Sequence, residues 1–168
     1  MLTEKTLLDM MDKSGYSYNL HTHEPLHTVE DSIKNRGLIK GAHSKNLFLK
    51  NKKNQFFLFS CLEETNIDLK KLSKSLSLGN PSFAKEEHLY SYLGVVPGSV
   101  TPYGLLNDFN NKVVFYLDSN FLKANSVNFH PLINTSTLNV NIKNLINFLK
   151  KNKKKVNVFD FNLYSLIG

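Results

Sequence analysis

Two short apolar runs separated by a polar turn constrain the fold of this chain more than any other feature. The runs are 46–50 (NLFLK) and 55–59 (QFFLF), and the four residues between them, 51–54, read NKKN. Phenylalanine and leucine runs of this length on either side of polar turn formers predict a β-hairpin. We therefore expect a sheet built around this hairpin.

Apolar residues at helical spacing predict helices before and after the hairpin. Gly15 and Gly94 are placed to end two of them, and Ser82 is placed to cap the start of another. Thr28, followed by acidic residues, is the predicted start of a shorter helix. The predicted helices are 3–14, 28–35, 68–76, 82–93 and 141–151.

Further strands are predicted from short β-prone runs bounded by turn formers. They cover 17–23, 99–106, 113–117 and 127–129, and the apolar tail 156–167 is expected to return to the core as a last strand. Many of the links are of hairpin length, which argues against a regular βαβ array. We predict an α+β fold with a mixed, barrel-like β-sheet surrounded by helices, in one domain that spans residues 1–168.

Composition excludes several classes of protein. Cys61 is the only cysteine, so the chain has no internal disulfide and no multi-cysteine zinc site, and its apolar surroundings predict a small buried side chain. No apolar run is long enough to cross a bilayer, so no membrane association is expected. The first residues lack the pattern of a secretory signal, and the expected compartment is the cytoplasm.

Familiar motifs for metals, nucleotides and nucleophilic serines are missing. His21, His23 and His27 lie close together, but Pro25 interrupts them and nothing completes a tetrahedral ligand set, so no metal site is predicted. The segment 98–104 has two glycines without the Gly-Lys-Ser/Thr ending of a phosphate-binding loop. A Gly-x-Ser-x-Gly nucleophile elbow is absent as well.

A dense polar segment opens the predicted hairpin. Residues 41–50 (GAHSKNLFLK) deliver Lys45 and Asn46 to the start of an apolar strand. A lysine in this position can hold a phosphate or polarise a reacting group, and an asparagine can both donate and accept hydrogen bonds. On spacing alone, a hairpin entrance with solvent-facing polar groups is the favoured interpretation.

A second candidate is His130, which stands directly before Pro131. The proline biases His130 toward extended geometry, so this side chain is expected to be held in place. It could bind a ribose hydroxyl or assist proton movement near neutral pH. A purely structural histidine is the alternative.

The charge balance allows a polyanionic partner. The chain has 21 Lys and Arg against 14 Asp and Glu, a formal net charge of +7. Such an excess favours nucleic acid if the charges share a face. The lysine cluster within 150–155 is either a solvated helix end or a contact to a tRNA backbone.

Four segments of the chain resemble the bacterial prolyl-tRNA editing domains. This family includes the YbaK proteins, the editing insertion of prolyl-tRNA synthetases and the stand-alone ProXp-ala or PrdX proteins, and the last group is the most similar. The matching segments are 41–50 (GAHSKNLFLK), 65–72 (TNIDLKKL), 93–108 (LGVVPGSVTPYGLLND) and 127–132 (VNFHPL).

The resemblance implies an aminoacyl-tRNA deacylase that removes alanine from mischarged tRNA(Pro) and rejects the bulkier prolyl group by sterics. It implies that the reaction requires Lys45 and His130, with Asn46 beside Lys45 in the pocket and the loop of His130, including Asn128 and Phe129, closing over the terminal adenosine. Backbone N–H groups around Gly98, Ser99, Val100 and Thr101 are expected to line the aminoacyl pocket.

An aminoacyl ester is already activated, so no cofactor is expected. The expected partners are the acceptor end of tRNA(Pro) and prolyl-tRNA synthetase. The alternatives are a Cys-tRNA(Pro) deacylase of the YbaK type and an inactive tRNA-binding or synthetase-partner module.

Overall fold

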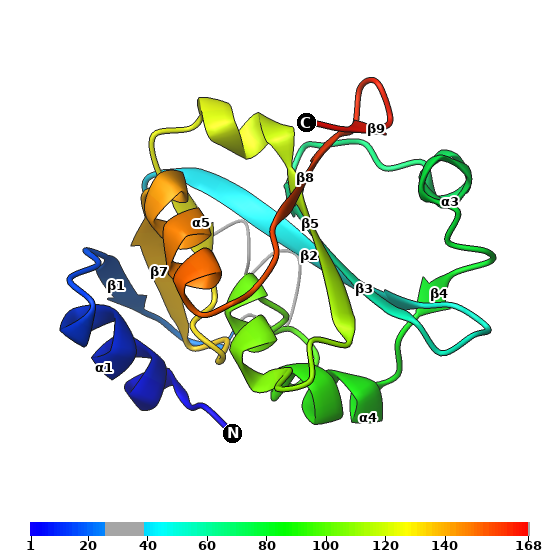
Figure 1. Ribbon diagram of the computed structural model, residues 1–168. Helices are drawn as coiled ribbons and strands as arrows, with labels where there is room; N and C mark the ends of the chain where they lie inside the picture. Colours follow the sequence, from blue (N-terminus) through cyan, green and yellow to red (C-terminus); the bar gives the residue numbers. More distant parts are fainter. Residues whose placement is uncertain (26–38, 168) are drawn as a thin grey trace.

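A computed structural model describes residues 1–25 and 39–167 of the chain (Figure 1). Its nine-stranded sheet follows the order β1-β7-β6-β2-β3-β5-β8-β9, and β4 pairs with β2 off this path. The strands are β1 (Asn19–Thr22), β2 (Ala42–Lys50), β3 (Phe56–Leu62), β4 (Ser82–Phe83), β5 (Val113–Asp118), β6 (Val127–Phe129), β7 (Ser136–Val140), β8 (Asn157–Asp160) and β9 (Ser165–Leu166).

The predicted hairpin is formed by β2 and β3. The strands pair antiparallel from Ser44↔Leu62 to Lys50↔Phe56. Asn51 holds the turn, because its Oδ1 accepts hydrogen bonds from the N–H groups of Lys53 and Gln55 at 3.1 and 3.0 Å. The amide side chain therefore closes the turn that the polar residues predict.

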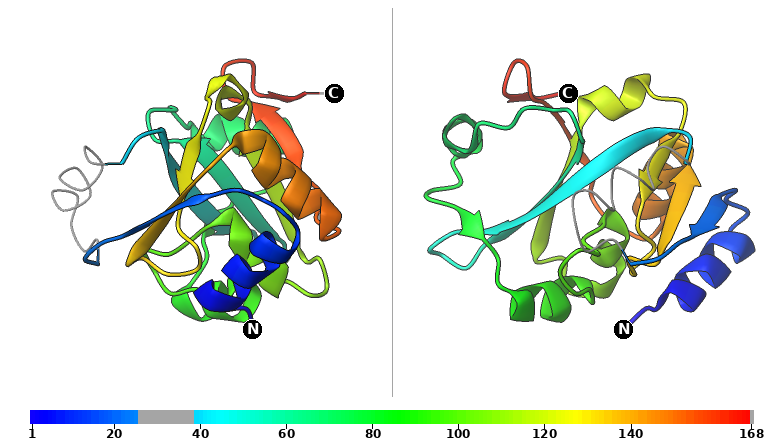
Figure 2. Two further views of the ribbon diagram at one scale, coloured as in Figure 1. Left: turned by 90° about the vertical axis from the view of Figure 1, so that its left-hand side faces the viewer. Right: turned by 180° about the vertical axis from the view of Figure 1, so that it is seen from behind.

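The sheet is mixed, as expected. β3 pairs parallel with β5, β5 with β8 and β2 with β6, whereas the pairs β6–β7 and β1–β7 are antiparallel. Helices pack on this sheet, and the right-hand view of Figure 2 shows α1 (Glu4–Lys13) and α5 (Ile142–Lys151) on the opposite side of the molecule from α3 (Leu69–Leu76). The predicted α+β class with a mixed sheet and surrounding helices is confirmed.

Successive residues of β2 and β3 face two different cores, because side chains alternate across a strand. Phe48 and Leu58 belong to a first core that includes residues of α1 and α5. Leu49 and Phe59 belong to a second core that includes Leu72 of α3. The hairpin therefore separates the two apolar layers of the molecule.

Three of the predicted helices are confirmed as α1, α3 and α5, capped by the side chains of Thr3, Asp68 and Asn141. The predicted helix 28–35 lies outside the described residues. The tail forms two short strands, β8 and β9, rather than one. Within residues 1–25 and 39–167, no helix has the length and apolar character needed to span a membrane.

The predicted helix 82–93 starts later than expected. Ser82 and Phe83 pair with Lys50 and Leu49 of the hairpin as β4, so Ser82 is not a helix cap. The helical turns begin with α4 (Glu86–His88) and continue as the π-helical turn η1 (Leu89–Leu93). They end at Gly94 with φ of 66°, as predicted for a glycine stop.

The strand predicted at 99–106 is wrong. Thr101 caps a 3-10 helix, η2 (Pro102–Asn107), with its hydroxyl accepting from the N–H of Tyr103 at 3.4 Å. Pro102 suits the first helical position, where its missing N–H costs nothing. All six residues of η2 are buried, and an apolar run of this length does not distinguish a buried helix from a buried strand.

Candidate functional site

One face of the β1-β7-β6-β2 part of the sheet carries polar side chains. Leu138 and Phe129 point into the first core, so their strand neighbours Thr137, Asn139 and Asn128 lie on the opposite face. Two side-chain contacts join neighbouring segments on this face. His23 Nε2 lies 2.9 Å from Thr137 Oγ1, and Asn139 Nδ2 donates to Asn128 Oδ1 at 2.9 Å. We call this surface the polar face.

Lys45 and His130 both belong to the polar face. The parallel pairing of β2 with β6 places His43 opposite Asn128, and Lys45 and His130 each follow two residues further along the same direction. Residues two apart in extended chain point to the same side. The two residues that the sequence singled out separately are thus brought into neighbouring segments on one face.

His130 is half-buried and held by one hydrogen bond. Its Nδ1 lies 2.8 Å from the carbonyl oxygen of Ser136, and because a carbonyl can only accept, Nδ1 carries the proton. Burial lowers the pKa of His130, the bond to Ser136 opposes that effect, and the nearby His23, with ring centroids 6.3 Å apart, lowers the pKa further. The neutral ring presents the lone pair of Nε2 as an acceptor.

The lowered pKa predicts an acid-dependent loss of stability. The unfolded chain binds the proton at the ordinary pKa of about 6.5 and the folded chain at a lower value, so the free energy of unfolding falls as the pH drops below about 6.5. Urea unfolding at pH 7.5 and 5.5 should therefore show a larger drop for wild type than for His130→Gln. Equal drops would contradict a His130 that is held neutral.

Lys45 is oriented by the turn that follows β3. Its Nζ donates to the carbonyl oxygen of Thr65 at 2.5 Å. The hydroxyl of Thr65 in turn donates to Asp118 Oδ2, at 2.5 Å, and Asp118 Oδ2 also accepts from the N–H of Leu62 at 3.1 Å. Asp118 is fully buried, and its other oxygen accepts from the N–H of Asn120. A buried carboxylate therefore fixes the turn to which the Lys45 ammonium is bound.

Sequence reasoning did not identify Asp118. An aspartate at the end of a predicted strand, followed by Ser119 and Asn120, is a helix-capping pattern, and Asp118 does cap the 3-10 helix η3 (Ser119–Lys123). That pattern could have located the cap. It carries no sign of the contact to Thr65, which depends on the pairing of β3 with β5.

Asn46 points to the other side of β2. Its Oδ1 accepts from Ser60 Oγ at 2.5 Å, and Ser60 lies opposite Asn46 in the hairpin and is fully buried. Alternation along the strand places Asn46 on the face of Phe48 and Lys45 on the face of Leu49. The structure does not bring the side chains of Lys45 and Asn46 together.

Asn128 and Phe129 have internal partners. Asn128 Nδ2 donates to the carbonyl oxygen of Lys40 at 3.0 Å. Phe129 is 2% exposed and packs on Phe121 with ring centroids 5.5 Å apart. The phenylalanine side chain, predicted to bind substrate, is instead part of the first core, as expected for an apolar residue facing inward along β6.

The loop 98–101 lies beside the segment that follows His130. A Cβ on Gly98, whose φ is 89°, would lie 3.6 Å from Asn134 Nδ2. The N–H of Ser99 already donates to the carbonyl oxygen of Val96. The hydroxyl of Thr101 caps the start of η2. Ser99 Oγ is buried and has no hydrogen-bond partner within the described residues.

The remaining candidates are structural. Cys61 is fully buried in the second core, and burial raises the pKa of its thiol, as predicted for a small buried side chain. Across residues 1–25 and 39–167, no three His, Cys, Asp or Glu side chains are grouped so that they could hold a metal ion.

Comparison with known proteins shows the family of the chain. Residues 23–148 match the family model described as "Aminoacyl-tRNA editing domain". The chain belongs to this family. The matched range includes β2, β3, β5 and β6, and it contains Lys45, Asp118 and His130.

Members of the editing-domain family similar to this chain occur in vertebrates and bacteria. The prolyl-tRNA synthetase associated domain-containing protein 1 of Xenopus laevis is 40% identical over 77% of this chain and 79% of its own length. The prolyl-tRNA editing protein ProX of Acetoanaerobium sticklandii is 31% identical over 90% of this chain and 93% of its own length.

A solved structure supports the fold. It is described as a candidate trans-editing enzyme for prolyl-tRNA synthetase, and it covers 100% of this chain and 99% of its own chain with a TM-score of 0.67. Its sequence identity to this chain is 18%, so the likeness concerns the fold alone.

Proposed function

We propose that the chain is a trans-editing hydrolase that removes alanine from mischarged tRNA(Pro). The observation that carries the proposal is the position of Lys45 and His130 in neighbouring segments of one polar face, in a chain of the aminoacyl-tRNA editing family. The two side chains supply a cation and a neutral imidazole whose Nε2 can accept a hydrogen bond. These are the groups needed to hold a phosphate and a ribose hydroxyl.

The reaction needs no enzyme nucleophile. The oxygen of a water molecule attacks the carbonyl carbon of the alanyl ester, the bond from that carbon to the ribose oxygen breaks, and the ribose oxygen takes a proton from the attacking water. Positioning the water and stabilising the developing oxyanion supply most of the acceleration. In this proposal Lys45 anchors the terminal nucleotide, and Nε2 of His130 accepts a hydrogen bond from a ribose hydroxyl.

The loop 98–101 is proposed to border the aminoacyl group. It adjoins the segment after His130, because a Cβ on Gly98 would lie 3.6 Å from Asn134 Nδ2. Val100 is half-buried against the first core, so the wall at this point is fixed. A fixed wall can admit a methyl side chain and exclude a prolyl ring by sterics.

The proposed partners are the acceptor end of tRNA(Pro) and prolyl-tRNA synthetase. The net charge of +7 favours association with RNA. The name of the Xenopus laevis relative refers to the synthetase, and this is the basis for proposing the synthetase as a partner.

A cysteine-specific deacylase and an inactive synthetase-partner module are the competing functions. Purified protein should be mixed in excess with tRNA(Pro) charged with alanine, cysteine or serine, and with Ala-tRNA(Ala) as the control substrate. We expect fast release of alanine from tRNA(Pro) and slow release in the other three reactions. Faster release of cysteine would favour the YbaK type of activity, and no release from any substrate would favour the inactive module.

A further inference from the structure

A pocket of about 940 Å³ lies beside the Thr65 turn, and its lining includes the start of α3, the segment 120–124 and the segment 161–164 near the C-terminus. We infer that this pocket binds an unpaired nucleotide of the RNA substrate, upstream of the terminal adenosine. The inference rests on the proposed function, since it names a second point of contact for the same substrate.

The pocket is joined to the candidate site through one residue. Thr65 lines the pocket, and its carbonyl oxygen accepts the hydrogen bond from Lys45 Nζ. The ammonium that is proposed to hold the terminal nucleotide therefore lies one hydrogen bond from the pocket wall. An RNA strand that leaves Lys45 in this direction reaches the pocket with its next nucleotides.

Tyr164 gives the pocket a surface on which a base can stack. Its hydroxyl accepts a hydrogen bond from the N–H of Asp68 at 2.9 Å, and its ring packs edge-on against Phe161 and Phe159, with centroids 6.1 and 6.0 Å away. The ring is thus fixed without a substrate. Aromatic rings held in this way stack bases of any sequence in single-stranded nucleic acids.

Two lysines supply positive charge at the pocket. Lys71 Nζ lies 5.7 Å from the centroid of the Tyr164 ring, and Lys123 reaches the pocket from η3. Both side chains are exposed and can approach a phosphate beside a stacked base.

Two carboxylates also line the pocket, and they reduce its positive charge to different extents. Asp68 accepts hydrogen bonds from the N–H groups of Lys70 and Lys71 at the start of α3, so the helix terminus offsets its charge. Glu64 is exposed and lies at the edge of the turn.

The amides of the pocket suit the edge of a base. Asn66, Asn120 and Asn162 line it from three different segments, and each amide can donate and accept hydrogen bonds. The volume falls within the range of about 300–1,000 Å³ typical of small-ligand sites, which is enough for one nucleotide with bound water. A lysine pair, a fixed aromatic ring and amides together favour RNA over an apolar ligand.

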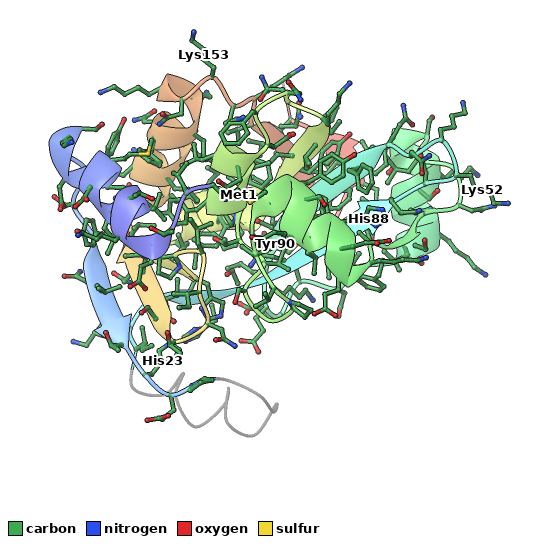
Figure 3. All side chains as sticks on the ribbon, turned by 90° about the horizontal axis from the view of Figure 1, so that it is seen from below. Met1, His23, Lys52, His88, Tyr90 and Lys153 are labelled. Carbon is green, nitrogen blue, oxygen red and sulfur yellow. The ribbon has the colours of Figure 1, made fainter. Side chains whose placement is uncertain are left out.

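The test compares a double variant of the pocket with a matched double variant elsewhere. Lys71→Ala/Lys123→Ala removes both exposed cations of the pocket. Lys52→Ala/Lys53→Ala removes two exposed cations from the hairpin turn, which Figure 3 places at the far end of the molecule from His23. Both proteins lose the same charge. KM and kcat are measured for release of alanine from Ala-tRNA(Pro) at several salt concentrations.

The pocket variant should show a KM raised about tenfold with an unchanged kcat, because binding is lost while the reacting groups stay in place. The slope of log KM against log salt should fall by about 1.4, the change for two single-strand phosphate contacts. The hairpin variant should match wild type. A third protein, Tyr164→Leu, should also raise KM alone, since it removes the stacking ring.

Equal KM values in the pocket variant and the hairpin variant would overturn the nucleotide site while leaving the proposed function intact. A fall in kcat as large as the rise in KM would also overturn it, because the pocket would then belong to the reacting centre. Wild-type protein that releases no alanine would refute the proposed function, and the inference with it.

Discussion

Replacing Lys45 by alanine is expected to slow release of alanine from Ala-tRNA(Pro) by about 100-fold, because a substrate that is no longer held in place reacts from a misaligned position. The side chain reaches the turn after β3 and donates to Thr65, so the ammonium occupies a fixed point on the polar face. Alanine leaves that point empty and removes the proposed anchor of the terminal nucleotide. Single-turnover deacylation measures the effect.

Lys52→Ala is the matched control for Lys45→Ala. Lys52 is exposed in the hairpin turn, and its loss changes the net charge by the same amount (Figure 3). The control should deacylate at the wild-type rate. Lys45→Arg should remain slow, because a planar guanidinium does not replace a compact ammonium that makes one short contact. A wild-type rate for Lys45→Ala would exclude the proposed role of this lysine.

Asp118→Ala is expected to have the largest effect on stability. The carboxylate is fully buried and accepts hydrogen bonds from Leu62, Thr65 and Asn120. Its removal leaves three donors without their acceptor, and each buried unsatisfied donor costs about 1–3 kcal/mol. We expect the free energy of unfolding to fall by about 3 kcal/mol or more, measured by urea denaturation.

The same substitution should slow deacylation, because the Thr65 turn that binds Lys45 loses its support. Asp9→Ala, which changes an exposed aspartate of α1, should leave both stability and rate within the error of wild type. Asp118→Asn keeps one acceptor oxygen and should fall between wild type and alanine in both measurements. Wild-type stability in Asp118→Ala would contradict the structural role, and a normal rate in a folded variant would contradict the link to Lys45.

Local patterns in the sequence were sufficient for the elements that depend on local chemistry. The hairpin follows from two apolar runs and the turn 51–54, and α3 follows from three leucines on one helical face. Local patterns failed at η2, because all of its residues are buried. The segment therefore lacks the alternation of apolar and polar residues that distinguishes a helix from a strand. β7 was missed because it is short and has only two apolar residues, Leu138 and Val140, separated by Asn139, a residue type that is depleted in strands.

The candidate site shows the same limit. Lys45 and His130 were found from short polar motifs and from the family resemblance, and the pairing of β2 with β6 places them on one face. Parallel pairing joins segments that are distant in the chain and has no local signature. For the same reason the sequence did not show that Asn46 faces away from Lys45, that Phe129 is part of the core, or that Asp118 supports the Thr65 turn.

The most direct measurement of the central claim is single-turnover release of the amino acid from tRNA(Pro) charged either with alanine or with proline, at equal concentrations of the protein. A trans-editing hydrolase with a fixed wall around the aminoacyl group should release alanine at least about 100-fold faster than proline, as steric exclusion allows. Equal rates for the two substrates, or release of neither, would contradict the account.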